Sequence, residues 1–157
     1  ENRISDAKAY AEKVLAVNIA DGYANSVVAM AQRAGGDIDG AIETALKGTE
    51  LAGSSPECAM QLAIAYLLKG DMDSAFGYIV SAYNDNQSID SFDLVLVFNA
   101  LYDGDDADIK TELESLVATV NQTYSYYGIT SLEDTTAIIN GTKTLRDVFM
   151  SGDYKLS

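Results

Sequence analysis

Residues 59–75 read AMQLAIAYLLKGDMDSA, an apolar run that leads into the dipeptide Gly70-Asp71. The same dipeptide stands at Gly36-Asp37 and at Gly104-Asp105, so it recurs every 34 residues (70 − 36 = 34 and 104 − 70 = 34). A constant period of this length is typical of stacked helical repeats, in which every unit is one supersecondary element. The register therefore predicts an all-α fold before any single helix is assigned.

Apolar residues, mostly small, recur at fixed offsets from each dipeptide. The positions eight before Asp are Ala29, Ala63 and Val97, and those four after it are Ala41, Ala75 and Ile109. Small side chains let two helices approach closely. We therefore expect each unit to be a helix, a Gly-Asp turn and a second helix, with Gly ending the first helix and Asp starting the second.

This register divides the chain into a repeat array and a tail. We expect a leading half-unit at 1–21, full units at 22–55, 56–89 and 90–128, and a helical cap or tail at 129–157. Ser5 and Asp6 are the expected caps of the first helix. Because the first residues fall within a unit, the sequence also predicts a piece of a longer protein. The expected helices span 5–17, 22–34, 38–52, 56–69, 72–84, 91–102, 107–127, 132–140 and 144–150.

The chain resembles the tetratricopeptide-repeat family across roughly residues 3–127. Residues 59–75 carry that family's Leu-Ala pair, its Tyr, its Gly-Asp turn and its later Ala, although the family's Trp and helix-ending Pro are missing. The resemblance implies a right-handed superhelix of antiparallel helix pairs. It also implies a concave groove, lined by the first helix of each pair, that holds a peptide or a helix of a partner protein.

A second apolar face recurs on the first helices at spacings of four and three residues, which place its members on one side of each helix. By the resemblance this face lines the groove. Arg33 is expected to bind a carboxylate or carbonyl at its edge. A competing interpretation is that the face is ordinary core, covered by Leu145, Val148, Phe149 and Met150 of the chain's own tail. The predicted groove residues are Met30, Arg33, Met60, Ile64, Leu67, Leu94, Phe98 and Leu101.

The charge balance disfavours several classes of partner. The chain has 24 Asp and Glu against 10 Lys and Arg, a formal net charge of −14. Nucleic acids and anionic membranes are both bound by clustered cations, so the excess of carboxylates disfavours both as partners. No apolar run approaches the ~20 residues that a membrane-spanning helix needs.

The absence of histidine removes the commonest general base and the commonest metal ligand. The acidic segment 103–108, with Glu114, only weakly resembles a calcium loop, because Ala107 and Asp108 stand where that loop needs an oxygen ligand and Gly. The sequence therefore predicts no catalytic residues, no metal site and no cofactor.

The predicted function is non-catalytic binding of a protein or peptide in an apolar groove. One alternative is a structural spacer or assembly element whose groove is sealed by the tail. Another is a substrate-recruiting domain of a larger enzyme. The compartment stays open, because a cytoplasmic and an extracytoplasmic domain both fit the composition.

Overall fold

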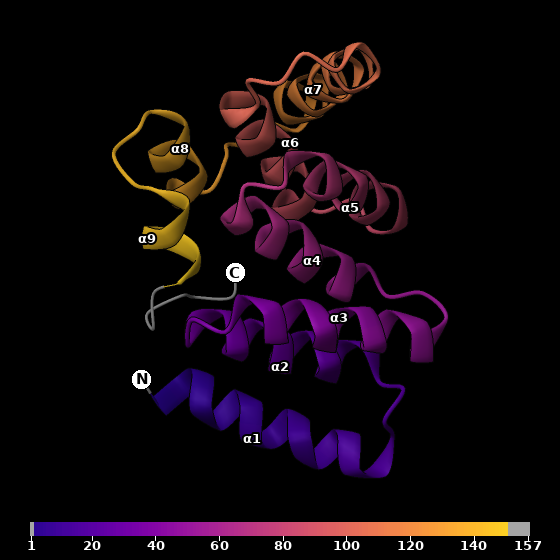
Figure 1. The fold of residues 1–157 in the computed structure, drawn as a ribbon. Helices are drawn as coiled ribbons and strands as arrows, with labels where there is room; N and C mark the ends of the chain where they lie inside the picture. The colour runs from indigo at the N-terminus through magenta and orange to yellow at the C-terminus, as the bar shows by residue number, and fades with distance from the viewer. Residues whose placement is uncertain (1, 151–157) are drawn as a thin grey trace.

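The fold is all-helical, and the computed structural model describes residues 2–150 (Figure 1). No strand occurs within these residues. The helices pack against their neighbours along the chain. They are α1 (Asn2–Val17), α2 (Gly22–Ala34), α3 (Ile38–Ala52), α4 (Pro56–Lys69), α5 (Met72–Asp85), α6 (Ile89–Leu101), α7 (Ala107–Tyr127), α8 (Glu133–Ile139) and α9 (Leu145–Phe149).

Four helices, α2, α3, α4 and α7, begin and end where the sequence predicts. The start of α1 is different: Ser5 and Asp6 lie inside the helix, so their assignment as caps was wrong. No Gly or Pro among residues 2–5 interrupts the helix there. Helix α6 begins two residues early, because Ser88 and Ser91 form a reciprocal capping box that starts the helix at Ile89.

The first two Gly-Asp turns have the same local structure. Gly36 and Gly70 both adopt positive φ, at 93° and 77°, a conformation that favours glycine. The side chains of Asp37 and Asp71 then accept hydrogen bonds from backbone N–H groups of α3 and α5. Each dipeptide therefore ends one helix and caps the next, as the sequence predicts.

The third turn departs from this pattern, and the expectation that Asp105 starts the next helix was wrong. Helix α6 ends at Leu101 with Tyr102 as its C-cap, and the N-cap of α7 is Asp106. A Cβ added to Gly104 would lie 2.5 Å from the hydroxyl of Tyr102, whose ring stacks on Phe98. The turn runs around this aromatic side chain. The turn is therefore longer, and the N-cap of α7 moves from Asp105 to Asp106.

Small residues form the contact inside the first two helix pairs. Ala29 and Ala41 are 0% and 2% exposed between α2 and α3, and Ala63 and Ala75 are both 0% exposed between α4 and α5. The pair of α6 and α7 carries Val97 and Ile109 at these sites and is in close contact over a shorter length. Larger side chains at the contact hold two helices further apart.

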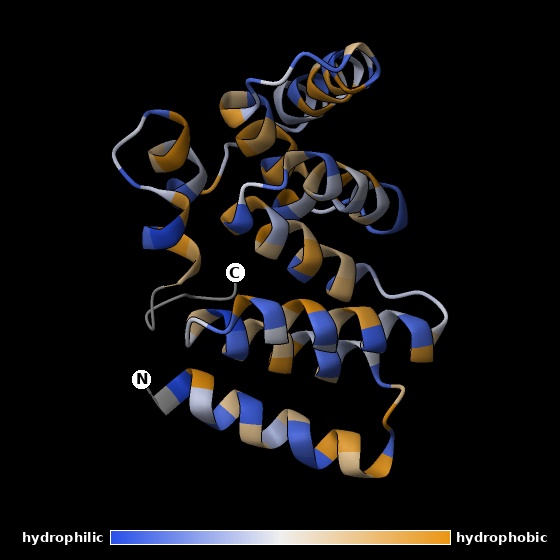
Figure 2. Ribbon diagram, viewed as in Figure 1, coloured by the Kyte–Doolittle hydropathy of each residue, from blue (hydrophilic) through white to orange (hydrophobic). Residues whose placement is uncertain are grey.

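The helices are arranged as a stack with a C-terminal flank. Figure 1 shows α1 to α7 following one another in layers, with α8 and α9 beside the stack. Helix α8 packs on α6, and α9 packs on α4. In Figure 2 the ribbon of α1 alternates between hydrophilic and hydrophobic segments, as expected for a helix with one packed face.

Candidate functional site

Most of the predicted groove residues are buried. Met60 is half-buried and Leu101 is 37% exposed. The exposed fractions of the other six are 2% for Met30, 1% for Arg33, 2% for Ile64, 3% for Leu67, 4% for Leu94 and 0% for Phe98. The predicted face is therefore largely inside the protein in this conformation.

The structure places Ile64, Leu67, Leu94 and Phe98 in one core cluster, with Met60 packed against it, and places Met30 in another. Met60, Ile64 and Leu94 line a common cavity. Met30 belongs to a core cluster with residues of α1. Phe98 packs against Phe76, with ring centroids 5.0 Å apart, so its side chain serves the core. Leu67 lies in the same core cluster as Phe98.

The C-terminal cover, which we define as residues 132–150, lies against the predicted groove. Val148 and Phe149 of α9 are 5% and 8% exposed. Arg33 Nε donates a hydrogen bond to the backbone carbonyl of Phe149 at 2.9 Å, and its guanidinium carbon lies 5.7 Å from the centroid of the Phe149 ring. Arg33 also donates to Oε1 of Gln61 on α4. The residue expected at the edge of the groove thus holds a segment of its own chain.

A buried carboxylate fixes the other half of the cover. Asp93 on α6 is 3% exposed. Its Oδ1 accepts from the hydroxyl of Tyr124 at 2.6 Å. Its Oδ2 accepts from the backbone N–H of Leu132 at 2.8 Å and from the hydroxyl of Thr135 at 2.7 Å. One side chain therefore joins α6, α7 and the start of α8.

The contact with Asp93 changes the acidity of Tyr124. Burial of the phenol raises the pKa of Tyr124 well above its ordinary value, and the hydrogen bond to Asp93 raises it further. Both causes disfavour the phenolate, which would be desolvated and would face a carboxylate. Tyr124 therefore acts as a hydrogen-bond donor at neutral pH.

A cavity of about 420 Å³ lies between the repeat helices and the cover. Its apolar walls come from α4, α6, α8 and α9, and its polar lining includes carboxylates of α6 and α8. A volume of this size is typical of small-molecule sites. The lining residues are Met60, Ile64, Asp90, Asp93, Leu94, Val97, Leu132, Glu133, Asp134, Thr135, Ile138, Lys143, Val148 and Phe149.

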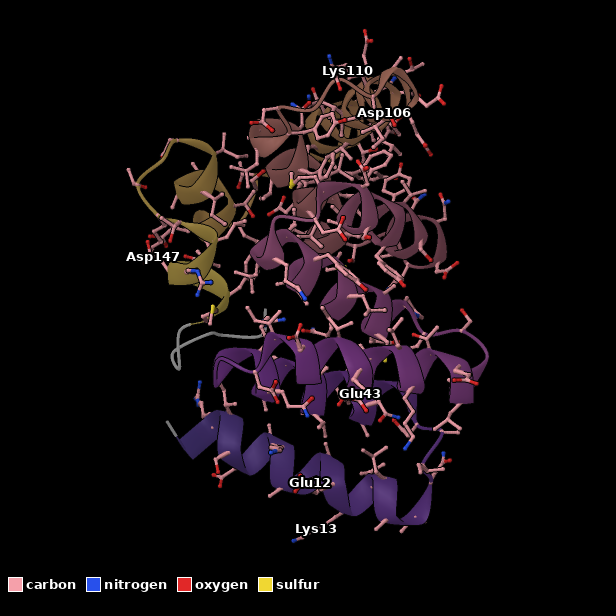
Figure 3. All side chains as sticks on the ribbon, viewed as in Figure 1. Glu12, Lys13, Glu43, Asp106, Lys110 and Asp147 are labelled. Atoms are coloured by element: carbon pink, nitrogen blue, oxygen red, sulfur yellow. The ribbon has the colours of Figure 1, made fainter. Side chains whose placement is uncertain are left out.

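Among residues 2–150, the one ammonium group in this lining is paired. Lys143 Nζ lies 2.7 Å from Oδ1 of Asp134, and this contact raises the pKa of Lys143. Figure 3 shows Asp147 on α9, where its carboxylate accepts from the N–H of Thr144 at 2.8 Å. That bond lowers the pKa of Asp147.

Sequence reasoning missed Asp93 and its three donors. The signal was present, because Asp93 is the one charged residue in the otherwise apolar and neutral run 91–102. A charged residue within an apolar helix needs buried hydrogen-bond partners. The identity of those partners, Tyr124 and the start of α8, followed only from the tertiary structure.

Two other features bear on function. A second hollow, lined by the turns 70–73 and 102–106, is strongly acidic. Across residues 2–150, however, no three or more carboxylate or thiol side chains are grouped so that they could hold a metal ion. In the same part of the chain, no helix combines the length and the apolarity required to cross a membrane.

Comparisons with protein-family models, with curated proteins and with solved structures find no match to this chain.

Proposed function

We propose that the chain is a tetratricopeptide-like solenoid that binds a protein or peptide segment without catalysis. The binding surface is the face of α2 and α4 that the C-terminal cover occupies. The observation that carries the proposal is the seating of α9, which contributes two apolar side chains and one backbone carbonyl to this face. A partner segment with the same elements would take the place of α9.

The contacts of α9 indicate what such a segment must offer. A short helix or turn with two adjacent apolar residues matches Val148 and Phe149. A free backbone carbonyl at its end matches the acceptor of Arg33, since a guanidinium binds a carbonyl oxygen through a charge-assisted hydrogen bond. Recognition through apolar anchors plus main-chain hydrogen bonds is common among peptide-binding grooves.

The proposal is tested with a peptide of residues 143–150 added to the whole chain. In the wild-type protein, α9 competes with the peptide at high effective concentration. The Phe149→Ala variant weakens α9, and we expect it to bind the peptide roughly tenfold more tightly than the wild type does. Fluorescence anisotropy of a labelled peptide measures both affinities, while circular dichroism checks that the variant is folded.

A peptide with Asp in place of Phe149 is the matched control, and we expect no binding of it. Adding Arg33→Gln to the Phe149→Ala variant should weaken binding again, because the carbonyl loses its charged donor and the Gln side chain is shorter. Equal affinities for the two peptides would contradict the proposal.

A second candidate function is structural, with the groove permanently sealed. The observation in its favour is the Asp93 cluster, in which two hydrogen bonds hold the start of α8 and a third holds Tyr124 of α7. In that case Phe149→Ala lowers the free energy of unfolding, yet no peptide binds to the variant. Fluorescence anisotropy of the labelled peptide with the folded Phe149→Ala variant therefore separates the two candidates.

A further inference from the structure

We propose that the cavity between α4, α6 and the C-terminal cover binds a small amphipathic cation, an apolar body that carries one protonated amine or guanidinium group. This site shares α4 with the peptide-binding face above, and Val148 and Phe149 of α9 close one side of it. It exists when the cover is in place, whereas a partner segment would require α9 to move.

The volume and the apolar walls of the cavity indicate that its ligand is a small organic molecule. Its volume is about 420 Å³, and small-molecule sites of this kind have apolar walls with a few polar groups. The walls here include the side chains of Met60, Leu94 and Ile138. They come from three different helices, so a compact apolar body would contact protein on several sides.

The charge of the lining determines the sign of the ligand. Among residues 2–150, the lining includes the carboxylates of Asp93 and Glu133, and the ammonium group of Lys143 pairs with Asp134. Asp93 is held by a phenol, a hydroxyl and a backbone N–H, which are all neutral donors. A buried carboxylate without a cationic partner is costly, so a cation in the cavity would be stabilised by it. An anion would be repelled.

Glu133 supplies a negative charge that can be altered without disturbing the core. It is exposed, and it lies in the first turn of α8, where it also lines the cavity. Replacing it with Gln keeps its shape and removes its charge. Glu112 on α7 is exposed and is not among the cavity residues, so Glu112→Gln is the matched control.

The test compares three probes with the same apolar body: 4-phenylbutylamine, 4-phenyl-1-butanol and 4-phenylbutyrate. Each is titrated into the ¹⁵N-labelled whole chain and followed by amide chemical shifts. We expect the amine to give saturable shifts at α4, α6 and α8. We expect it to bind about tenfold or more tightly than the carboxylate, because the two differ by the sign of one charge in a half-solvated site.

Two variants localise the binding. Glu133→Gln should weaken the amine roughly two- to fivefold, the scale of a partly exposed ion pair, and leave the alcohol unchanged. Glu112→Gln should change neither. Met60→Trp fills the cavity from α4 and should abolish binding of all three probes, with the melting temperature reporting whether it folds.

Equal affinity for amine and carboxylate, shifts centred away from these helices, or no saturable binding of the amine would each overturn the proposal. These results would leave the peptide-binding function untouched, because that function is read from a different probe on a different variant. Conversely, failure of the peptide to bind would not contradict the cation site.

Discussion

Arg33 and Phe149 are 116 positions apart in sequence, yet the Arg33 guanidinium donates to the Phe149 carbonyl at 2.9 Å. Both residues are buried. This contact joins the first complete helix pair to the last helix, and it makes the seating of α9 depend on one cation.

Replacing Arg33 with Met should release α9. The Met side chain keeps the unbranched apolar stem but is shorter, and the Phe149 carbonyl loses a charge-assisted donor, at a cost of about 2 kcal/mol in the free energy of unfolding. Hydrogen exchange should accelerate at residues 145–150 more than at α4. Arg146→Met, at an exposed site on α9 itself, is the control and should leave exchange at residues 145–150 and the free energy of unfolding nearly unchanged.

Asp93→Asn should destabilise the protein more than its small change in shape suggests. The carboxylate accepts three hydrogen bonds on two oxygens, whereas the amide has one acceptor oxygen and would turn its NH₂ group toward a donor. An unsatisfied buried donor costs about 1–3 kcal/mol. Urea unfolding measures the loss.

Asp85 is the comparison site for this substitution. It is exposed at the end of α5, so Asp85→Asn should change the free energy of unfolding little. A similar effect of the two variants would mean that the three donors around Asp93 find other acceptors.

The free energy of unfolding should fall at alkaline pH because the Tyr124 phenol ionises. The folded protein raises the pKa of Tyr124 above the value of 10.0 that it has in the unfolded chain. Its contribution to stability is therefore fully present below pH 10 and is lost progressively as the pH rises above that value. Chemical unfolding across pH 8–12 should show a steeper alkaline loss for the wild type than for Tyr124→Phe.

Two glycines inside helices should respond to alanine in opposite ways. A Cβ on Gly48 would lie 2.6 Å from the Cβ of Asn25 and 3.0 Å from the sulfur of Cys58, so Gly48→Ala should cost about 1–3 kcal/mol by overpacking. Gly77 on α5 is exposed, with nothing within 4 Å of an added Cβ. Gly77→Ala should therefore stabilise the protein by about 0.5–1 kcal/mol. Thermal unfolding of both variants checks the sign of each change.

Phe98→Ala should lower the free energy of unfolding, because Phe98 is a core residue rather than an exposed binding residue. Phe98 is 0% exposed and packs against Phe76 and Tyr102, so its truncation should cost about 3–5 kcal/mol. Leu101, three residues later on α6 and 37% exposed, is the control, and Leu101→Ala should cost much less. Guanidinium unfolding compares the two.

The all-α fold and most helix bounds could be predicted from sequence, because capping residues and the 34-residue register are local signals. Asp37 and Asp71 act as caps in the way that the register predicts. The third turn could not be predicted, because the placement of Gly104 depends on how Tyr102 packs.

The candidate site was predictable only in part, for a similar reason. The spacing predicts one shared face for Met60, Ile64 and Leu94, and the three residues line one cavity. It carries no information on what covers that surface. The partners of Asp93 lie 31 to 42 positions away along the chain, and such pairings follow from how helices pack rather than from periodicity.

Within residues 2–150 the buried apolar side chains form three clusters, and their sizes predict an order of melting along the chain. The cluster beneath α1 is small and rests on Ala11, Ala24, Val27 and Met30, whereas the largest spans α4 to α9. The contacts of α1 with α2 belong to this small cluster, and local opening is cheapest where the least apolar surface is buried. Heating should therefore fray the chain from α1 inward, and the C-terminal half, closed by its own last two helices, should lose its protection against hydrogen exchange last.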